Sequence, residues 1–192
     1  RALYALLERL LRLTGLHDGQ ALGLTGFGAS AHLVLKMVRH RYPHMPVYVF
    51  SRTETEQAFA RELGAAWAGH TDAISPVPLD AIIDTTPAWT PVVAALRNLA
   101  PGGRLVINAI RKEDRDRDAL LRLDYPAHLW LEREVKSVAN VTRQDVSEFL
   151  ALAAEMPILP EVQEYELEAA NRALVELKAR RIRGAKVLTI SP

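Results

Sequence analysis

The sequence predicts an α/β fold in which a doubly wound, mostly parallel sheet is flanked by helices on both faces. Short apolar runs of strand length alternate with amphipathic segments of helical length along most of the chain. Strands joined by helical crossovers pair in parallel, and both faces of the resulting sheet are covered. With 192 residues and 49% hydrophobic residues, the chain is also long enough to bury a core.

Composition excludes several classes of function. The net charge of +1 favours neither disorder nor an electrostatic nucleic-acid surface. The absence of cysteine excludes disulfides, thiolate zinc sites and thiol catalysis, and is compatible with the cytoplasm, where we expect the protein. No apolar run approaches the about 18 to 20 residues of a membrane span. We therefore expect no nucleic-acid and no membrane partner.

The first third of the chain predicts three strands and three helices. Leucines at helical spacing precede Thr14 and Gly15, so the chain begins with an amphipathic helix that ends at glycine. Thr53 and Glu56 have the spacing of a capping box, which predicts the start of another helix. The expected elements after the first helix are a strand at 21–25, a helix at 30–40, a strand at 47–50, a helix ending near 63 and a weak strand at 65–68.

The rest of the chain continues the alternation. Thr142 and Asp145 predict a second capped helix. The run at 111–118, RKEDRDRD, is expected to be solvated and without a role. The expected elements are strands at 79–84, 104–109, 135–141 and 186–190, helices at 91–100, 142–154 and 167–177, and a turn at 101–103.

A glycine-rich turn separates the first strand from the second helix. Gly26 permits a tight turn, Gly28 lets a pyrophosphate approach the backbone, and a small residue at Ala31 lets helix and strand pack closely. The amides at the helix N-terminus then face the phosphates. This context favours a nucleotide site, although a simple tight turn remains the alternative.

The end of the second strand indicates which nucleotide is bound. An acidic residue there binds the adenosine ribose in NAD(H) sites and in S-adenosylmethionine sites, but this chain has Ser51, Arg52 and Thr53. A hydroxyl and a guanidinium are suited to a 2′-phosphate, which a carboxylate would repel. We therefore expect NADP(H) rather than NAD(H). In the alternative, Arg52 is a solvated loop residue while Ser51 and Thr53 only cap the next helix.

From Leu11 onward, the chain resembles the cofactor-binding half of zinc-dependent alcohol dehydrogenases, in the medium-chain dehydrogenase/reductase superfamily. The resemblance rests on the joint order of six segments, which are GLTGFGASA, VYVFSRTETEQAFARELGAAWAG, LDAIIDTTP, LAPGGRLVINAI, VKSVANVTRQDVSEFLALAAE and LEAANRALVELKARRIRGAKVL. It implies a single NADP(H)-binding Rossmann domain over 1–192. It also implies that 142–192 is a C-terminal return that packs toward a catalytic domain.

The resemblance also implies the cofactor-binding residues. The turn would hold the pyrophosphate, Ser51 and Arg52 the adenosine end, and the later strand ends the nicotinamide side. Arg183 matches an arginine that reaches the phosphates, with a surface cation at a helix end as the equal alternative. The full expected set is Gly26, Phe27, Gly28, Ala29, Ser30, Ala31, Ser51, Arg52, Thr53, Thr85, Thr86, Asn108, Ala109, Asn140, Val141 and Arg183.

The catalytic elements of the family are not visible in this chain. In the relatives a preceding domain binds zinc, which polarises the substrate oxygen. Ala2 stands where the relatives have a zinc-ligand cysteine, and the six histidines lack ligand spacing. We therefore expect neither catalytic residues nor a metal site here, and zinc only in the missing domain.

The expected function is NADP(H) binding within an oxidoreductase that transfers hydride between NADP(H) and an alcohol or aldehyde, the chain alone being inactive. The resemblance also implies a homodimer paired through the strand near 136–140, because an unpaired sheet edge favours pairing. The alternative is a stand-alone dinucleotide-sensing module without catalysis. A short-chain reductase is disfavoured because no Tyr-x-x-x-Lys pair is present, and a methyltransferase because the ribose-binding acid is missing.

Overall fold

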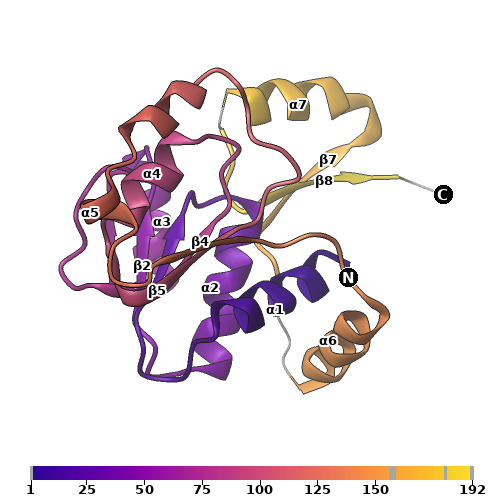
Figure 1. Ribbon diagram of the computed structural model, residues 1–192. Coiled ribbons are helices and arrows are strands. Elements are labelled where there is room, and N and C mark those ends of the chain that lie inside the picture. The colour runs from indigo at the N-terminus through magenta and orange to yellow at the C-terminus, as the bar shows by residue number, and fades with distance from the viewer. Residues whose placement is uncertain (1, 156–158, 180, 191–192) are drawn as a thin grey trace.

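A six-stranded parallel sheet forms the centre of the protein (Figure 1). The computed structural model describes residues 2–155, 159–179 and 181–190, so Arg1 and Pro192, the limits of the expected domain, lie outside it. The strand order β3-β2-β1-β4-β5-β6 is that of the doubly wound Rossmann fold. The strands are β1 Leu22–Thr25, β2 Val47–Phe50, β3 Trp67–Gly69, β4 Leu79–Asp84, β5 Leu99–Ile107 and β6 Glu134–Ser137. The expected fold class is confirmed.

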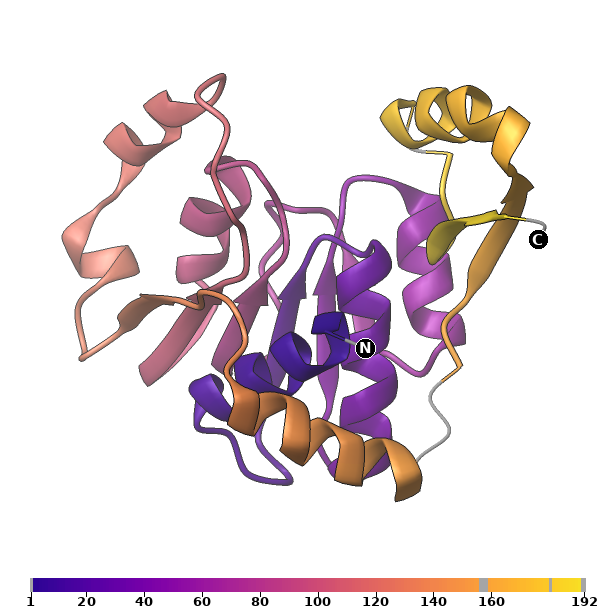
Figure 2. The same ribbon diagram turned by 90° about the vertical axis from the view of Figure 1, so that its right-hand side faces the viewer.

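Helices cover both faces of the sheet (Figures 1 and 2). Alternate residues of the strands point to opposite faces. Val47 and Val49 therefore join a core with α1, α2 and α3, whereas Tyr48 and Phe50 join a second core with α4. The helices are α1 Ala2–Thr14, α2 Ala29–Arg41, α3 Glu54–Glu62, α4 Thr90–Leu96, α5 Tyr125–His128, α6 Arg143–Glu155 and α7 Ala170–Lys178, with short 3-10 helices η1 Arg117–Arg122 and η2 Leu167–Ala169. Within the described ranges, no helix has the length and apolar character needed to cross a bilayer.

Two boundaries around β5 differ from the sequence prediction. Helix α4 ends at Leu96 rather than at 100, and the expected turn at 101–103 lies inside β5. Leu79 of β4 pairs with Leu99, but Ala81 pairs with Arg104, so β5 contains extra residues at this point. Gly102 there has a φ of +70°, a conformation that glycine adopts without strain. The residues expected to form a turn between a helix and a strand therefore form a bulge within one strand instead.

The C-terminal strands also differ from expectation. Strand β6 ends at Ser137 instead of 141, and the sequence missed β7, Val162–Glu166. Strand β8, Ala185–Thr189, pairs in parallel with β7 in a separate two-stranded sheet. Three of the five residues of β7 are Gln or Glu, and two of them are adjacent, so the strand lacks the alternation of apolar residues that would predict it.

A buried carboxylate joins the first helix to the sixth. Asp145 and Thr142 exchange hydrogen bonds, which confirms the expected cap of α6. The Asp145 carboxylate also accepts from Arg9 at 2.9 Å and from Arg12. Burial alone would raise the pKa of Asp145, but the bonds donated by Thr142, Arg9 and Arg12 hold that pKa far below its ordinary value.

We predict that Asp145→Asn lowers the free energy of unfolding by about 2 to 3 kcal/mol, because two arginines lose a buried partner. A carboxylate with a depressed pKa stabilises the folded state above its ordinary pKa of about 4, and this contribution is lost as the pH falls. The variant should therefore show a weaker acid dependence in urea denaturation at pH 3 to 7. Glu148→Gln, which removes a surface charge that contacts Arg12 and Gln144, is the control. Equal stability of wild type and Asp145→Asn at pH 7 would contradict the prediction.

Candidate functional site

Two glycines of the turn after β1 meet different constraints. Gly26 has a φ of +75°, and a Cβ there would lie 2.9 Å from Thr86 Cγ2 and 3.2 Å from Thr85 Oγ1. A Cβ on Gly28 would have no atom within 4 Å. Gly26 is thus required by the protein itself, whereas Gly28 borders open space, as the pyrophosphate hypothesis expects.

The turn leads directly into α2, whose N-cap is Gly28. A glycine provides no side-chain cap, so the N–H groups of the first turn, which contains Ala29 and Ser30, keep their hydrogen-bonding capacity. Ala31 is fully buried, as close packing of helix on strand requires. Phe27 is also buried and packs edge-on against Phe59 of α3, with ring centroids 5.4 Å apart.

A buried histidine, which the sequence did not single out, supports this turn. Both the backbone N–H of His32 and its Nδ1 lie within hydrogen-bonding distance of the Gly28 carbonyl, at 3.2 and 3.1 Å. Burial lowers the pKa of His32. The imidazole is therefore neutral at physiological pH, with Nδ1 as the donor to Gly28.

The carboxylate of Asp84, at the end of β4, connects the strand ends below the turn. It is fully buried and accepts from Thr25 Oγ1 at 2.6 Å and from Thr86 Oγ1 at 2.7 Å. Thr85 Oγ1 donates to the Thr25 carbonyl at 2.9 Å. These bonds fix the two threonines that border Gly26.

The charged run at 111–118 is not simply solvated, and that expectation is wrong for two of its residues. The Lys112 side chain is only 8% exposed. Its Nζ donates to Asp84 and to the carbonyls of Thr86 and Ala88. Asp116 accepts from the N–H groups of Trp89 and Thr90, at 2.9 and 2.8 Å. Because every residue of this run is charged, the local sequence does not indicate which of the side chains are buried.

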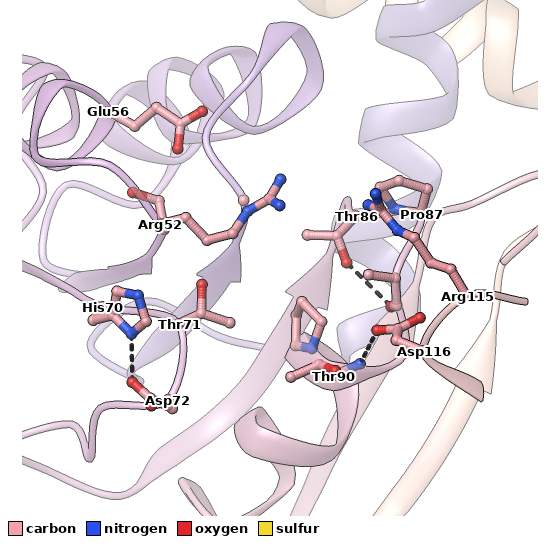
Figure 3. A pocket seen from close by; sticks show the side chains of 14 residues that line it. Arg52, Glu56, His70, Thr71, Asp72, Thr86, Pro87, Thr90, Arg115 and Asp116 are labelled. Carbon is pink, nitrogen blue, oxygen red and sulfur yellow. Dashed lines mark hydrogen bonds and ion pairs between the residues drawn. The ribbon is translucent and has the colours of Figure 1, made fainter. Parts of the chain in front are cut away.

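A cavity of about 370 Å³ opens beside the turn, at the carboxyl ends of β1, β2 and β4 (Figure 3). Ligands of open α/β sheets bind in this position, where the strand order reverses. Four of the expected site residues line it, namely Gly26, Ser51, Arg52 and Thr86. The remaining lining residues are Glu56, His70, Thr71, Asp72, Pro87, Ala88, Thr90, Pro91, Arg115 and Asp116.

The residues after β2 divide between capping and facing the cavity. Thr53 Oγ1 accepts from the Glu56 N–H at 3.2 Å, so Thr53 caps α3. Ser51 is buried at the cavity wall. Arg52 is exposed, extends into the cavity in Figure 3, and pairs with no carboxylate of the described chain.

A carboxylate that the sequence reasoning missed also lines this cavity. Glu56, in the first turn of α3, is half-buried there (Figure 3), and burial raises its pKa. In the sequence Glu56 lies outside positions 51–53, which immediately follow the strand. The helical turn brings Glu56 back toward Ser51, a proximity that the capping-box spacing should have indicated.

The remaining expected residues do not line the cavity. Asn108 follows β5 and its N–H donates to the Asp84 carbonyl at 2.7 Å, with Ala109 next in the chain. Asn140, with a φ of +54°, and Val141 lie after β6. Arg183 pairs with Glu62 of α3 at 2.6 Å and stacks over Phe59 at 4.1 Å. Across the described part of the chain, no three His, Cys, Asp or Glu residues are grouped as a metal site.

Comparisons with known proteins show a similarity to alcohol dehydrogenases. No protein-family model matches the chain. A probable alcohol dehydrogenase, AdhA, from Mycobacterium tuberculosis is 39% identical over 182 residues, which cover 95% of this chain and 51% of the relative. The chain is therefore similar in sequence to an alcohol dehydrogenase, and it spans about half the length of this curated relative.

Solved dehydrogenase structures share the fold of this chain. CAD from Helicobacter pylori, complexed with NADP(H), has a TM-score of 0.78 at 17% identity, covering 97% of this chain and 52% of the other. Acetophenone reductase from Geotrichum candidum, in complex with NAD, has a TM-score of 0.74 at 16% identity, covering 98% and 53%. At these identities the likeness establishes the fold.

We predict that alanine in place of Gly26 destabilises the protein, whereas alanine in place of Gly28 leaves its stability unchanged. Gly26→Ala should lower the free energy of unfolding by about 1 to 2 kcal/mol or more, because alanine resists a positive φ and its Cβ meets Thr86. Gly28→Ala should unfold at the wild-type denaturant concentration, because its Cβ meets open space. Urea denaturation of both variants tests this, and equal midpoints for the two would contradict it.

Proposed function

We propose that this chain binds NADP(H) as the cofactor-binding part of an oxidoreductase that transfers hydride between NADP(H) and an alcohol or aldehyde. One observation carries the proposal. The open space at Gly28, the uncapped start of α2 and the Arg52 guanidinium all border the same end of the sheet. Phosphate groups are favoured at such a helix start because its free N–H groups and dipole attract anions.

The pyrophosphate would lie against the turn from Gly26 to Ala31. The vacant volume at Gly28 lets an anion approach the backbone to hydrogen-bonding distance. His32 and Asp84 hold the two sides of this turn, through the Gly28 carbonyl and through Thr86. The backbone donors are thus oriented before the cofactor arrives, which lowers the entropic cost of binding.

The adenosine end would occupy the cavity beside Ser51 and Arg52. The solved structures of similar fold hold NADP(H) in one case and NAD in the other, so the choice depends on local residues. Arg52 offers a charge-assisted contact to a 2′-phosphate, and the buried Ser51 hydroxyl lies at the same wall. Thr53 would contribute through its cap of α3, which fixes where Ser51 and Arg52 lie.

The nicotinamide side would extend along the ends of β4, β5 and β6. We assign Thr85, Asn108, Ala109, Asn140 and Val141 to it, because they follow these adjacent strands. For Arg183 to contact the phosphates, its ion pair with Glu62 would have to break and be replaced by one with the cofactor.

Catalysis would need more than these residues. The bound cofactor supplies the hydride, and in the family zinc and most of the substrate pocket belong to another domain. We therefore propose that the chain alone binds cofactor without turnover. We further propose that 1–192 is one domain and that 142–192 packs toward the catalytic domain. Exposed apolar side chains in the last elements support this packing, namely Leu174, Val175, Leu188 and Ile190.

A homodimer is also proposed. Strand β6 is one edge of the sheet, its four residues are exposed, and Val135 among them is 47% exposed. Backbone groups along an edge strand are available for pairing with a second copy.

We predict that Arg52→Gln weakens NADPH binding about tenfold while leaving NADH binding unchanged, because only NADPH carries the 2′-phosphate. Isothermal titration of both nucleotides measures the two dissociation constants. Arg172→Gln removes an exposed arginine of α7 and serves as the matched control. Equal losses for NADPH and NADH would show that Arg52 does not recognise the 2′-phosphate, and no binding of either nucleotide to wild type would refute the proposed function.

We predict that Glu56→Gln strengthens NADPH binding about fivefold at pH 8, because an ionised Glu56 would repel the 2′-phosphate across the cavity. Burial raises the pKa of Glu56, so the repulsion appears as the pH rises through that pKa and vanishes below it. The ratio of variant to wild-type affinity cancels the titration of the phosphate itself, and it should approach one as the pH falls below the pKa of Glu56. Glu54→Gln, on the exposed side of α3, is the control. A ratio near one at every pH would contradict the prediction.

A further inference from the structure

The loop between β5 and η1 forms a fixed wall of the cavity. Lys112 Nζ donates to the carbonyls of Thr86 and Ala88, at 2.8 and 3.0 Å. The backbone N–H of Glu113 donates to the Pro87 carbonyl at 2.7 Å. Asp116 accepts from two backbone N–H groups of the segment after β4. The loop is therefore bonded to the segment 84–90 on both sides of Arg115.

Arg115 extends from this wall into the cavity. Figure 3 shows Arg52 and Arg115 reaching toward each other from opposite sides, one from the segment after β2 and the other from the loop. Arg115 is 59% exposed and pairs with Glu113 through Nε, at 2.6 Å. Its terminal nitrogens bond to no residue that the structure describes, so they are free to meet a ligand.

Most of the acidic side chains that line the cavity with the two arginines are engaged in other hydrogen bonds. The Asp116 carboxylate is directed to the N–H groups of Trp89 and Thr90, and the Asp72 carboxylate to His70. Burial would raise the pKa of Asp116, but these N–H groups and nearby Arg115 hold it below the ordinary value. Two of the three lining carboxylates, those of Asp72 and Asp116, thus already have hydrogen-bond partners, and Glu56 is the third.

We propose that Arg115 is a second phosphate-binding residue of the cofactor site, placed opposite Arg52 by the anchored loop. This inference rests on the proposed function and names the residue that would complete its phosphate recognition. A guanidinium matches the oxygens of a phosphate in a bidentate manner. The phosphate is either the 2′-phosphate or the pyrophosphate of the dinucleotide. The anchors at Lys112 and Asp116 position the loop, whereas Arg115 itself contacts the ligand.

The test is isothermal titration of the full-length protein with NADPH and with NADH, comparing wild type, Arg115→Gln and Arg117→Gln. Arg117 lies two residues along and is exposed, so its substitution controls for the change in net charge. Because the Arg115 side chain is largely exposed, its replacement should leave the melting temperature unchanged. We expect Arg115→Gln to weaken NADPH binding about fivefold, the scale of a partly exposed charged contact.

The two nucleotides distinguish the two phosphates. A loss for NADPH alone assigns Arg115 to the 2′-phosphate, and an equal loss for NADPH and NADH assigns it to the pyrophosphate. If wild type binds NADPH and Arg115→Gln behaves like Arg117→Gln, Arg115 serves only its pair with Glu113 and this inference fails while the proposed function stands. If wild type binds neither nucleotide, the proposed function fails and the inference falls with it.

Discussion

The buried carboxylate of Asp84 is the constraint on which the geometry of the site depends. It accepts hydrogen bonds from Thr25 at the end of β1 and from Thr86 just after β4. It also forms an ion pair with Lys112 in the loop after β5. Both Asp84 and Lys112 are withdrawn from water, and such a pair is costly to break because either partner would be left buried and unpaired. Three segments that are distant in sequence therefore keep one arrangement at the point where the strand order reverses.

The shape and charge of the cavity follow from this arrangement. Thr86, held by Asp84, lies so close to Gly26 that only glycine fits there, while the space at Gly28 stays open. Lys112, held by the same carboxylate, places the loop that carries Arg115 opposite Arg52. The buried ion pair thus positions Thr86 beside Gly26 and the loop that carries Arg115, whereas the Thr53 cap of α3 places Arg52 on the other side of the cavity.

The sequence predicted the parts that local physics determines. The alternation of strands and helices, the caps at Thr53 and Thr142 and the two glycines of the turn all depend on residues within a few positions of each other. What it missed depends on contacts across the fold. Lys112 meets Asp84 28 positions away in the chain, so its burial has no local signal. Strand β7 is mostly polar and lacks an alternating apolar pattern. The bulge in β5 contains the same glycines that an ordinary turn would have, so the sequence alone does not distinguish the two.

The most direct measurement is a crystal structure of the protein grown with NADPH. The account predicts electron density for the pyrophosphate against the backbone of the turn from Gly26 to Ala31, with the adenosine in the cavity beside Arg52 and the Asp84–Lys112 pair intact. Density for the nucleotide at another place on the protein, or a turn that rearranges to fill the space above Gly28, would contradict it.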